Sequence, residues 1–408
     1  MVDVVVVGAG IIGLSVALNL QERGREVLVI DRALPGEATS SGNAGIIQAD
    51  GVVPVAFTRV WSEFLSYARN RDNEAYYHWT APLRFAPQFF AYWQNGTPEH
   101  IERTIRANFP LFKDAVSEHE RLASAANMSS LLRRTGWMKV FRSEAAFLTS
   151  ERQRARLIAL GINSEILNKN EIWALEPGLS KIVCGGILFP DSPTLSDPLQ
   201  LSRGYFELFK SRGGQFRQIP VTVPMRTAAG WNVAGSEARD VVLATGPWSG
   251  DLANRLGYRI PFFVKRGYHR HYASTGTKLT RPIYDAEGGY VIAPMDKGLR
   301  ITTGVEFAPR DAKPTPVQLT RVEPWARELV ALGQPIDNQS WLGSRPCLPD
   351  MIPVIGPATN HRGLWFCFGH GHHGLTLGPA SGRLIAELIT GTEPFIDPAP
   401  YRVDRSYY

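Results

Sequence analysis

The sequence VVVVGAGIIG occupies residues 4–13 of this 408-residue chain. Its first four residues are β-branched valines, as expected of a strand buried on both faces of a parallel sheet. Its glycines have the spacing G-x-G-x-x-G, and residues 14–23 after them have the apolar pattern of a helix that ends at Gly24. The stretch therefore predicts a strand, a tight turn and a helix, which begin a Rossmann-type dinucleotide-binding unit.

Each glycine of this motif has its own physical role. Gly8 allows the tight turn, Gly10 lets the backbone approach a pyrophosphate, and Gly13 lets the helix pack closely on the strand. The N-terminus of the helix offers free N–H groups and the positive end of a dipole to the phosphates. A second strand at residues 26–30 ends at Asp31, whose carboxylate can accept hydrogen bonds from an adenosine ribose. Because an acid there also repels a 2′-phosphate, the motif disfavours NADP.

The charges of the chain are dispersed and slightly basic. The chain has 44 Lys and Arg against 38 Asp and Glu, which gives a formal net charge of +6. No run of Lys and Arg is dense enough to form a nucleic-acid patch, so we expect no nucleic-acid partner. An anionic small substrate and an anionic membrane surface both remain compatible with this charge.

The cysteines and the apolar segments indicate the compartment. Cys184, Cys347 and Cys367 have neither paired nor metal-ligand spacing, which predicts buried free thiols and no metal site. Residues 4–20 are apolar, but no basic residue precedes them and glycines interrupt them, so we do not expect a signal peptide. No other stretch reaches the length of a transmembrane helix. We expect a cytoplasmic protein, with peripheral attachment to the inner membrane as the alternative.

The later segments distinguish FAD from NAD. A nicotinamide-binding domain would continue with alternating strands and helices, whereas here a polar loop, SSGNAG at 40–45, leads into a long aromatic-rich, largely helical stretch. Two further nucleotide-domain signals come much later: a strand and loop at 240–249, and a strand with the glycine-rich turn GHGHHG at 364–374. A helix from about residue 375 to 389 follows the second of them. The nucleotide domain is therefore predicted to be split, with other material inserted.

These motifs together resemble the D-amino-acid oxidase superfamily of FAD-dependent amine dehydrogenases and oxidases. Within that superfamily the chain is most similar to the small subunit of the bacterial D-amino-acid dehydrogenase type. The resemblance covers essentially the whole chain, and its motifs keep their order. The residues that carry it are GAGIIG with Asp31, SSGNAG at 40–45, PLRFAPQFFAYWQNGTP at 82–97, ATGPWS at 244–249, KRGYH at 265–269, WLGSRPCLPDMIPVIG at 341–356 and GHGHHGLTLGPASG at 369–382.

The resemblance implies an α/β fold. It consists of a Rossmann-like FAD-binding domain and an interleaved α+β substrate domain on a mixed or antiparallel sheet. We place the FAD-binding domain at residues 1–54, 150–260 and 340–408, and the substrate-binding domain at residues 55–149 and 261–339.

The cofactor implied is FAD, held without a covalent bond. Relatives of the sarcosine-oxidase kind attach the flavin through a cysteine six residues before the Pro-Asp pair, and here Gly343 has that position. A helix N-terminus near residue 374 can stabilise the negative charge of a reduced flavin. The residues expected to bind FAD are Gly8, Gly10, Ile12, Gly13, Asp31, Arg32, Ser40, Ser41, Gly42, Asn43, Ala44, Gly45, Val221, Thr245, Gly246, Trp248, Arg345, Gly371, His372, His373, Gly374, Leu375 and Thr376.

The substrate residues are expected near the flavin. The planar guanidinium of Arg345 can bind a substrate carboxylate through two parallel hydrogen bonds, and the resemblance places this arginine over the flavin. Tyr268 resembles the family's substrate-facing tyrosine and would orient the substrate. Gln48 is expected on the floor of the pocket. The alternatives are a structural ion pair for Arg345 and an ordinary sheet tyrosine for Tyr268.

Three histidines lie close together at His370, His372 and His373. We expect neither a metal site nor an acid–base cluster, because metal ligands need convergent geometry and the family uses no metal. We assign His370 to the substrate pocket and the other two to the flavin edge. The family commonly has other residues at 372 and 373, so substrate choice stays open here.

The reaction implied is oxidation of the Cα–N bond of a D-amino acid, with hydride transfer to flavin N5 and electrons passing on to a quinone or another acceptor. The imine would be hydrolysed to a 2-oxo acid and ammonia, or persist as a pyrroline carboxylate when the substrate is a cyclic imino acid. Three alternatives remain: a D-proline or cis-4-hydroxy-D-proline dehydrogenase, an O₂-using glycine or sarcosine oxidase-like enzyme, and a subunit that only relays electrons.

An aromatic-rich stretch lies at residues 76–93, with Arg84 its only Asp, Glu, Lys or Arg. It predicts a lid over an apolar substrate, a membrane-contacting patch near a quinone acceptor, or helices packed on the core. Its aromatic residues are Tyr76, Tyr77, Trp79, Phe85, Phe89, Phe90, Tyr92 and Trp93.

Overall fold

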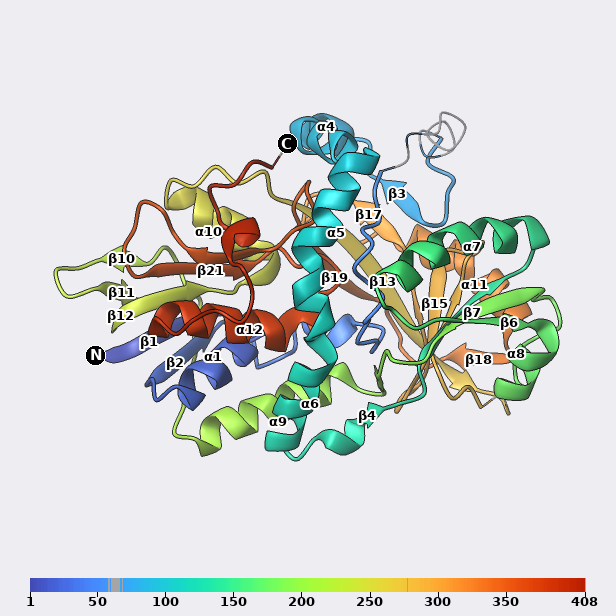
Figure 1. Ribbon diagram of the computed structural model, residues 1–408, viewed down its shortest axis with the longest axis horizontal. Helices are drawn as coiled ribbons and strands as arrows, with labels where there is room; N and C mark the ends of the chain where they lie inside the picture. The colour runs from blue at the N-terminus through green and yellow to red at the C-terminus, as the bar shows by residue number, and fades with distance from the viewer. Residues whose placement is uncertain (58, 60–66, 68, 277, 408) are drawn as a thin grey trace.

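The computed structural model describes residues 1–57, 59, 67, 69–276 and 278–407. Two sheets lie side by side along its long axis, and helix α5 (Pro98–Lys113) runs across the front between them (Figure 1). The sheet that contains the N-terminal strand is at the left of that view, and the sheet at the right is built mainly from central segments of the chain.

The first sheet is the predicted dinucleotide-binding sheet. Strand β1 (Val2–Val7) lies at its centre and pairs in parallel with β2 (Val27–Asp31) and β12 (Ser236–Leu243). The sheet extends in parallel to β9 (Gln215–Gln218) beside β2 and to β21 (Leu364–Phe368) beside β12. Antiparallel strands complete it, namely β10 (Met225–Arg226), β11 (Trp231–Val233) and β20 (Val354–Pro357). Strands far apart in sequence therefore form one sheet, as the split motifs predicted.

The helices on this sheet pack unusually closely. Helix α1 (Ile11–Glu22) contacts α12 (Gly374–Thr390) along its length. A Cβ atom at Gly382 would lie 2.6 Å from the carbonyl carbon of Ser15, so only glycine allows this approach. Helix α1 ends at the predicted place, where Gly24 has φ +73°. Helices α9 (Pro198–Ser211), α5 and α6 (Ala115–Ala125) cover the α1–α12 pair.

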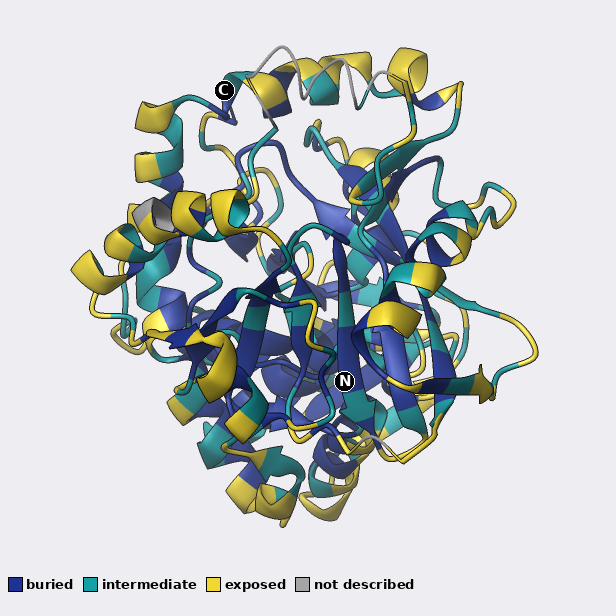
Figure 2. Ribbon diagram, turned by 90° about the vertical axis from the view of Figure 1, so that its right-hand side faces the viewer, coloured by how far each residue is buried: buried dark blue, intermediate teal, exposed yellow. Residues whose placement is uncertain are grey.

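The second sheet is mixed. Its order is β3-β17-β13-β16-β15-β14-β5-β7-β6, with β18 and β19 also paired to β13, and only β14–β5 and β17–β3 are parallel pairs among its described strands. Buried strands form its interior and exposed helix faces lie around it (Figure 2). The strands are β3 (Ala75–Tyr77), β5 (Trp137–Phe141), β6 (Glu165–Asn168), β7 (Gly185–Phe189), β13 (Phe263–Ser274), β14 (Ile283–Asp285), β15 (Tyr290–Met295), β16 (Gly298–Thr302), β17 (Val305–Phe307), β18 (Leu332–Pro335) and β19 (Trp341–Cys347).

Shorter elements connect the two sheets and cover their edges. They are α3 (Ala81–Arg84), α4 (Ala86–Gln94), α7 (Glu144–Ala159), α8 (Lys169–Leu175), α10 (Ser249–Arg255), α11 (Val317–Leu329), the strand pair β4 (Leu132–Arg133) and β8 (Thr194–Leu195), and the 3₁₀ helices η1 (Thr39–Gly42), η2 (Ser129–Leu131), η3 (Gly246–Trp248) and η4 (Ala399–Tyr401). None of the described helices combines the length and the apolar character needed to cross a membrane.

The fold class is as predicted, but the predicted domain boundaries differ from the sheet topology. Strands β6, β7 and β19 belong to the second sheet, although residues 150–260 and 340–408 were assigned to the FAD-binding domain. Conversely, α5 and α6 were assigned to the substrate-binding domain, but they pack on α12, which lies with the first sheet. The reason is that strand pairing ignores chain order: β19 is antiparallel to β13, and β7 lies between β5 and β6.

Candidate active site

One cavity of about 2320 Å³ runs from the N-terminus of α1 to Arg345 and the glycine-rich turn before α12. It brings together most of the predicted cofactor residues, although they come from three distant parts of the chain. Gly13, Ser41, Gly45 and Thr376 do not line it. The predicted residues that do are Gly8, Gly10, Ile12, Asp31, Arg32, Ser40, Gly42, Asn43, Ala44, Val221, Thr245, Gly246, Trp248, Arg345, Gly371, His372, His373, Gly374 and Leu375.

The end of the cavity at α1 fits an adenine dinucleotide. Gly8 has φ +114°, and a Cβ atom there would lie 2.4 Å from the carbonyl oxygen of Ala244. A Cβ atom at Gly13 would lie 1.8 Å from the carbonyl oxygen of Gly8, so the turn requires both glycines. A Cβ atom at Gly10 would lie 3.2 Å from the hydroxyl of Ser40 and would narrow the approach to the helix N-terminus. The backbone is thus left open where phosphates would bind.

Three side chains shape the adenosine part of this end. The carboxylate of Asp31 accepts hydrogen bonds from the backbone N–H groups of Ala9 (2.7 Å) and Ala33 (2.9 Å), which fixes its position at the tip of β2. The guanidinium of Arg32 stacks over the ring of Trp248 at 4.1 Å. This pair forms a flat wall beside the carboxylate, as an adenine ring requires.

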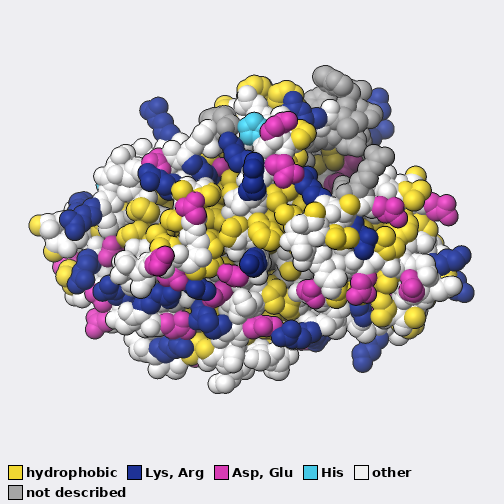
Figure 3. Space-filling view, in the orientation of Figure 1, with side chains coloured by type: hydrophobic (Ala, Val, Ile, Leu, Met, Phe, Trp, Pro, Cys, Tyr) yellow, Lys and Arg dark blue, Asp and Glu magenta, His cyan; other side chains and the backbone are white. Residues whose placement is uncertain are grey.

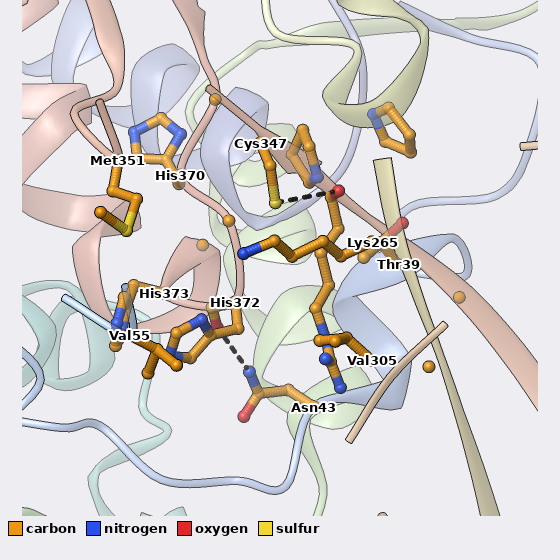
Figure 4. A pocket seen from close by; sticks show the side chains of 18 of the residues that line it. Thr39, Asn43, Val55, Lys265, Val305, Cys347, Met351, His370, His372 and His373 are labelled. Atoms are coloured by element: carbon orange, nitrogen blue, oxygen red, sulfur yellow. Dashed lines mark hydrogen bonds between the residues drawn. The ribbon is translucent and has the colours of Figure 1, made fainter. Parts of the chain in front are cut away.

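The other end of the cavity joins the loop at 40–48 to the start of α12. The backbone N–H of Gln48 donates to the hydroxyl of Thr376 (3.1 Å), and the amide of Asn43 donates to the carbonyl of His372 (3.5 Å; Figure 4). Helix α12 begins at Gly374, so its unpaired first-turn N–H groups lie at the cavity wall. This arrangement fits the anionic edge of a reduced flavin. We also find Gln48 on the cavity wall, as expected.

Arg300 of β16 holds the loop, a role that the sequence did not reveal. Its guanidinium donates to the carbonyls of Ser41 (3.1 Å) and Asn43 (2.5 Å), and its Nε donates to Nε2 of His271 (3.0 Å). Burial lowers the pKa of Arg300 to about 10. Its neighbour on the sheet, His269, stacks on Trp341 at 4.7 Å. The loop is therefore fastened to the second sheet.

Arg345 lies on the wall of the cavity without an acidic partner. Its guanidinium donates to the backbone carbonyls of Gly304 (3.1 Å) and Thr303 (3.2 Å). No carboxylate of the described residues lies within ion-pair distance, although burial lowers the pKa of this guanidinium. The two carbonyls orient the planar group but do not neutralise it. The alternative of a structural ion pair for Arg345 therefore finds no support among the described residues.

Lys265 is a second cation near Arg345, and it was not among the predicted site residues. It lies on β13 directly opposite Arg345 of β19 and lines the cavity. Its Nζ donates to the hydroxyl of Tyr92 (2.8 Å) and lies 4.0 Å from the centre of that ring. Figure 4 shows it extending toward the region between His370 and His372.

The hydroxyl of Tyr268 is engaged within the protein. Its side chain is buried, and its hydroxyl donates to Glu306 (2.9 Å) and accepts from Arg266 (3.0 Å) and the N–H of Thr315 (2.7 Å). A hydroxyl has one donor and two acceptor positions, so none is left for a substrate. Lys265 and Gly267 face Arg345, and the alternation of β13 turns Tyr268 to the opposite face. Tyr268 also lines the cavity, so its expected contact with the substrate stays a prediction, and the three hydrogen bonds of its hydroxyl favour the alternative of a sheet tyrosine.

The surroundings of His370 and His373 keep both side chains uncharged near neutral pH. Burial lowers the pKa of His370 to about 3, and its Nε2 is 3.0 Å from the hydroxyl of Ser381. Burial also lowers the pKa of His373 to about 3, and its ring packs edge-on against Phe112 at 4.9 Å. The side chain of His372 is exposed to the cavity. No group of His, Cys, Asp or Glu in the described part of the chain could hold a metal ion.

A buried carboxyl group, Asp50, also borders the cavity and was not predicted. It accepts hydrogen bonds from Trp137 (2.9 Å) and Ser192 (2.9 Å), and burial raises its pKa. A sequence signal for this residue was lacking, because its partners come from two other segments. All three cysteines are free, and two of them, Cys347 and Cys367, line the cavity.

Comparison with known proteins extends these observations. The family described as FAD dependent oxidoreductase (DAO) matches residues 3–388. A D-amino-acid oxidase of Bradyrhizobium diazoefficiens is 29% identical over 98% of this chain and 98% of its own length. A D-amino acid dehydrogenase of Paramagnetospirillum magneticum is 30% identical, also over 98% of both chains. The crystal structure of glycine oxidase from Geobacillus kaustophilus superimposes with a TM-score of 0.77 and 21% identity, covering 99% of each chain.

Proposed function

Because this chain belongs to the DAO family of FAD-dependent oxidoreductases, we propose that it oxidises the Cα–N bond of a D-amino acid. Bound FAD supplies the acceptor for the hydride that leaves Cα. Water then hydrolyses the resulting imine to a 2-oxo acid and ammonia. The names of the similar oxidase and dehydrogenase support this assignment, and the cavity has room for both cofactor and substrate.

The observation that carries the proposal is the unpaired guanidinium of Arg345. The carbonyls of Thr303 and Gly304 hold its plane fixed, while its remaining N–H groups are left for an anion. A carboxylate bound there would form charge-assisted hydrogen bonds in an environment with little water. The chain thereby fixes one end of an amino acid and limits the positions of its Cα.

The neighbouring groups complete the pocket. His370 and His373 stay uncharged, so they add no positive charge next to the amine of the substrate. Gln48 lines the cavity from the loop that follows Asn43. Arg300 keeps that loop in place through its contacts with two carbonyls. These residues bind and orient the substrate, and none of them needs to remove a proton from Cα.

Anaerobic reduction of the bound FAD tests the proposal. The purified protein is mixed with D-amino acids, their L-enantiomers, glycine and sarcosine, and bleaching of the flavin absorbance is followed. We expect bleaching by D-amino acids and its loss in Arg345→Ala with FAD still bound. If Arg345→Ala retained full turnover with every amino acid tried, the carboxylate assignment would be wrong, and a subunit that only relays electrons would gain support.

Measurements on the same purified protein distinguish two narrower alternatives. A D-proline or cis-4-hydroxy-D-proline dehydrogenase would be bleached by cyclic imino acids far faster than by primary D-amino acids. An oxidase would form hydrogen peroxide when the reduced protein meets air, whereas a dehydrogenase would reoxidise slowly in air and quickly with a quinone. The similar proteins include both an oxidase and a dehydrogenase, so both measurements are needed.

We assign the electron acceptor to a membrane quinone on the basis of one exposed surface. Part of the aromatic stretch is packed, with Phe89 5.0 Å from Phe307, but Trp79 and Leu83 are 81% and 86% exposed. Apolar side chains gather there over α4, beside Lys and Arg side chains (Figure 3). Exposed Arg84 adds the charge that an anionic bilayer attracts. Flotation with anionic vesicles should carry the protein, and Trp79→Ser with Leu83→Ser should reduce this.

A further inference from the structure

Among the cations that line the cavity, Lys265 and Arg345 lie on neighbouring strands, where one cation would be enough to bind the carboxylate of an ordinary amino acid. Lys265 and Arg345 are direct partners in the antiparallel pair β13–β19, so their side chains leave the sheet on the same face. Like charges directly opposite each other destabilise a sheet. Their side chains then diverge, Arg345 toward the carbonyl of Gly304 and Lys265 toward the hydroxyl of Tyr92. The two side chains therefore place their positive charges at two separate positions in the same cavity.

The ammonium group of Lys265 has no anionic partner among the described residues. Its one hydrogen-bond partner is Tyr92, whose own hydroxyl donates to the carbonyl of Val55. Apolar and aromatic side chains surround it, with the rings of Phe263 and Phe307 at 5.7 Å and 5.9 Å from its Nζ. Lys265 is half-buried on the cavity wall, so an anion that enters the cavity can reach its ammonium group and form a charge-assisted hydrogen bond.

The acidic side chains that line the cavity are engaged elsewhere, and two of them, Asp251 and Asp311, form ion pairs with Arg310. Asp50 accepts hydrogen bonds from Trp137 and Ser192, and Glu74 accepts one from Tyr284 (2.9 Å). Asp31 is fixed by backbone N–H groups at the opposite end. None of the described carboxylates pairs with Lys265, so the position beside its ammonium group is open to an anionic group of a ligand.

We propose that the substrate is an amino dicarboxylate, such as D-aspartate or D-glutamate, whose side-chain carboxylate binds Lys265 while its α-carboxylate binds Arg345. This assignment rests on the proposed function and narrows its substrate class. The oxidation is unchanged: a hydride leaves Cα for the bound FAD, the nitrogen loses a proton, and hydrolysis gives a 2-oxo dicarboxylate and ammonia. The amide analogues D-asparagine and D-glutamine have the same shape but no second charge.

The test compares each diacid with its amide under anaerobic conditions on the FAD-loaded protein. We expect kcat/KM for at least one diacid to exceed that of its amide by about tenfold or more, because only the diacid can form a charge-assisted hydrogen bond with Lys265. Lys265→Met should lower this diacid-to-amide ratio by about tenfold or more and raise kcat/KM for D-methionine. Lys265→Arg should restore most of the ratio.

A control and a binding measurement make the test independent of turnover. Lys210→Met on the exposed face of α9 removes the same charge far from the cavity and should leave the ratio unchanged. Calorimetric titration with glutarate, which cannot be oxidised here, should show tighter binding than butyrate in the parent protein and equal binding in Lys265→Met. FAD content and melting temperature are measured for every variant.

The outcomes separate the two proposals. Equal kcat/KM for diacids and amides in the parent protein would refute the dicarboxylate assignment and leave the proposed function intact. A loss of FAD from Lys265→Met with an unchanged ratio would also refute it and would assign Lys265 to the cofactor. If no amino acid reduced the flavin, the proposed function would fail, and preferential glutarate binding would still report on Lys265.

Discussion

Gly267 lies directly beneath the guanidinium of Arg345. A Cβ atom at Gly267 would be 2.6 Å from Nη2 of that arginine, and the two residues belong to neighbouring strands, β13 and β19. The glycine thus provides the space in which the guanidinium lies flat and reaches the carbonyls of Thr303 and Gly304. The position of the proposed carboxylate-binding group depends on the absence of a methyl group.

Gly267→Ala is therefore expected to impair substrate binding without unfolding the protein. The added methyl meets the end of a flexible side chain, so Arg345 shifts and the sheet keeps its register. The loss of well-oriented hydrogen bonds of about 1.5–3 kcal/mol should raise KM for amino acids about tenfold to a hundredfold. Steady-state kinetics measure this, with FAD content and melting temperature as controls. An unchanged KM would show that Arg345 does not bind the carboxylate.

The flavin should be released by acid. The position at which related enzymes carry a cysteine for covalent attachment is Gly343, and the side chain of Cys347 is buried beside the carbonyl of Arg345. Precipitation with trichloroacetic acid should leave a yellow supernatant and a colourless pellet. Flavin that stayed with the pellet would contradict non-covalent binding. Absorbance at the flavin maximum in each fraction gives the result.

The buried hydrogen-bond network around Tyr268 should contribute to the free energy of unfolding. Arg266 and Glu306 are both completely buried and form an ion pair at 2.6 Å. Glu306→Gln leaves Arg266 without its partner and should cost about 3–5 kcal/mol of unfolding free energy. Tyr268→Phe removes one hydroxyl and should cost about 1–3 kcal/mol. Urea titration measures both.

The same Tyr268→Phe variant tests whether the tyrosine contacts the substrate. Because its hydroxyl is occupied by Glu306, Arg266 and Thr315, we expect KM for the best substrate to change by less than about threefold, which corresponds to about 0.7 kcal/mol. A tenfold rise in KM with unchanged stability would mean that the hydroxyl contacts the substrate after all. Thr315→Ala, which keeps the backbone N–H, is the matched control.

The strand–turn–helix at the N-terminus was predictable because its signals are local. Each residue type in this stretch favours one local conformation: the four valines favour a strand, the three glycines allow the turn, and Gly24 ends the helix. The structure places β1, α1 and the helix end accordingly. Domain boundaries were not predictable in this way. Strand β19 joins the second sheet because it pairs with β13, and such pairing leaves no signal in the residues between them.

The same distinction explains the site. The adenosine end depends on backbone geometry that only glycine permits, and glycine is visible in the sequence. Lys265 and Arg300 gain their importance from partners in other segments, Arg345 and the carbonyl of Asn43. For Tyr268 the alternation of a strand defines two faces but not which of them meets the cavity. That choice is made by the register of β13 with β19.

The stability of the protein should fall in mild acid because of buried histidines. His119 of α6 is completely buried, with its Nε2 2.7 Å from the carbonyl of Leu375 in the first turn of α12. Burial lowers its pKa to about 4, whereas an unfolded histidine titrates near pH 6.5. Between these values the unfolded state binds the extra proton, so the folded state loses stability as the pH falls from about 6.5 toward 4.

His119→Gln isolates this contribution, because its amide can still donate to the carbonyl of Leu375 but does not titrate. A single histidine of this kind costs about 1.4 kcal/mol per pH unit below 6.5. His370, with a pKa of about 3, adds a similar dependence that the variant retains. We expect urea-unfolding free energies at pH 7.5 and 5.5 to differ by about 1 kcal/mol less in the variant than in the parent. Parallel pH dependences would show that folding does not lower the pKa of His119.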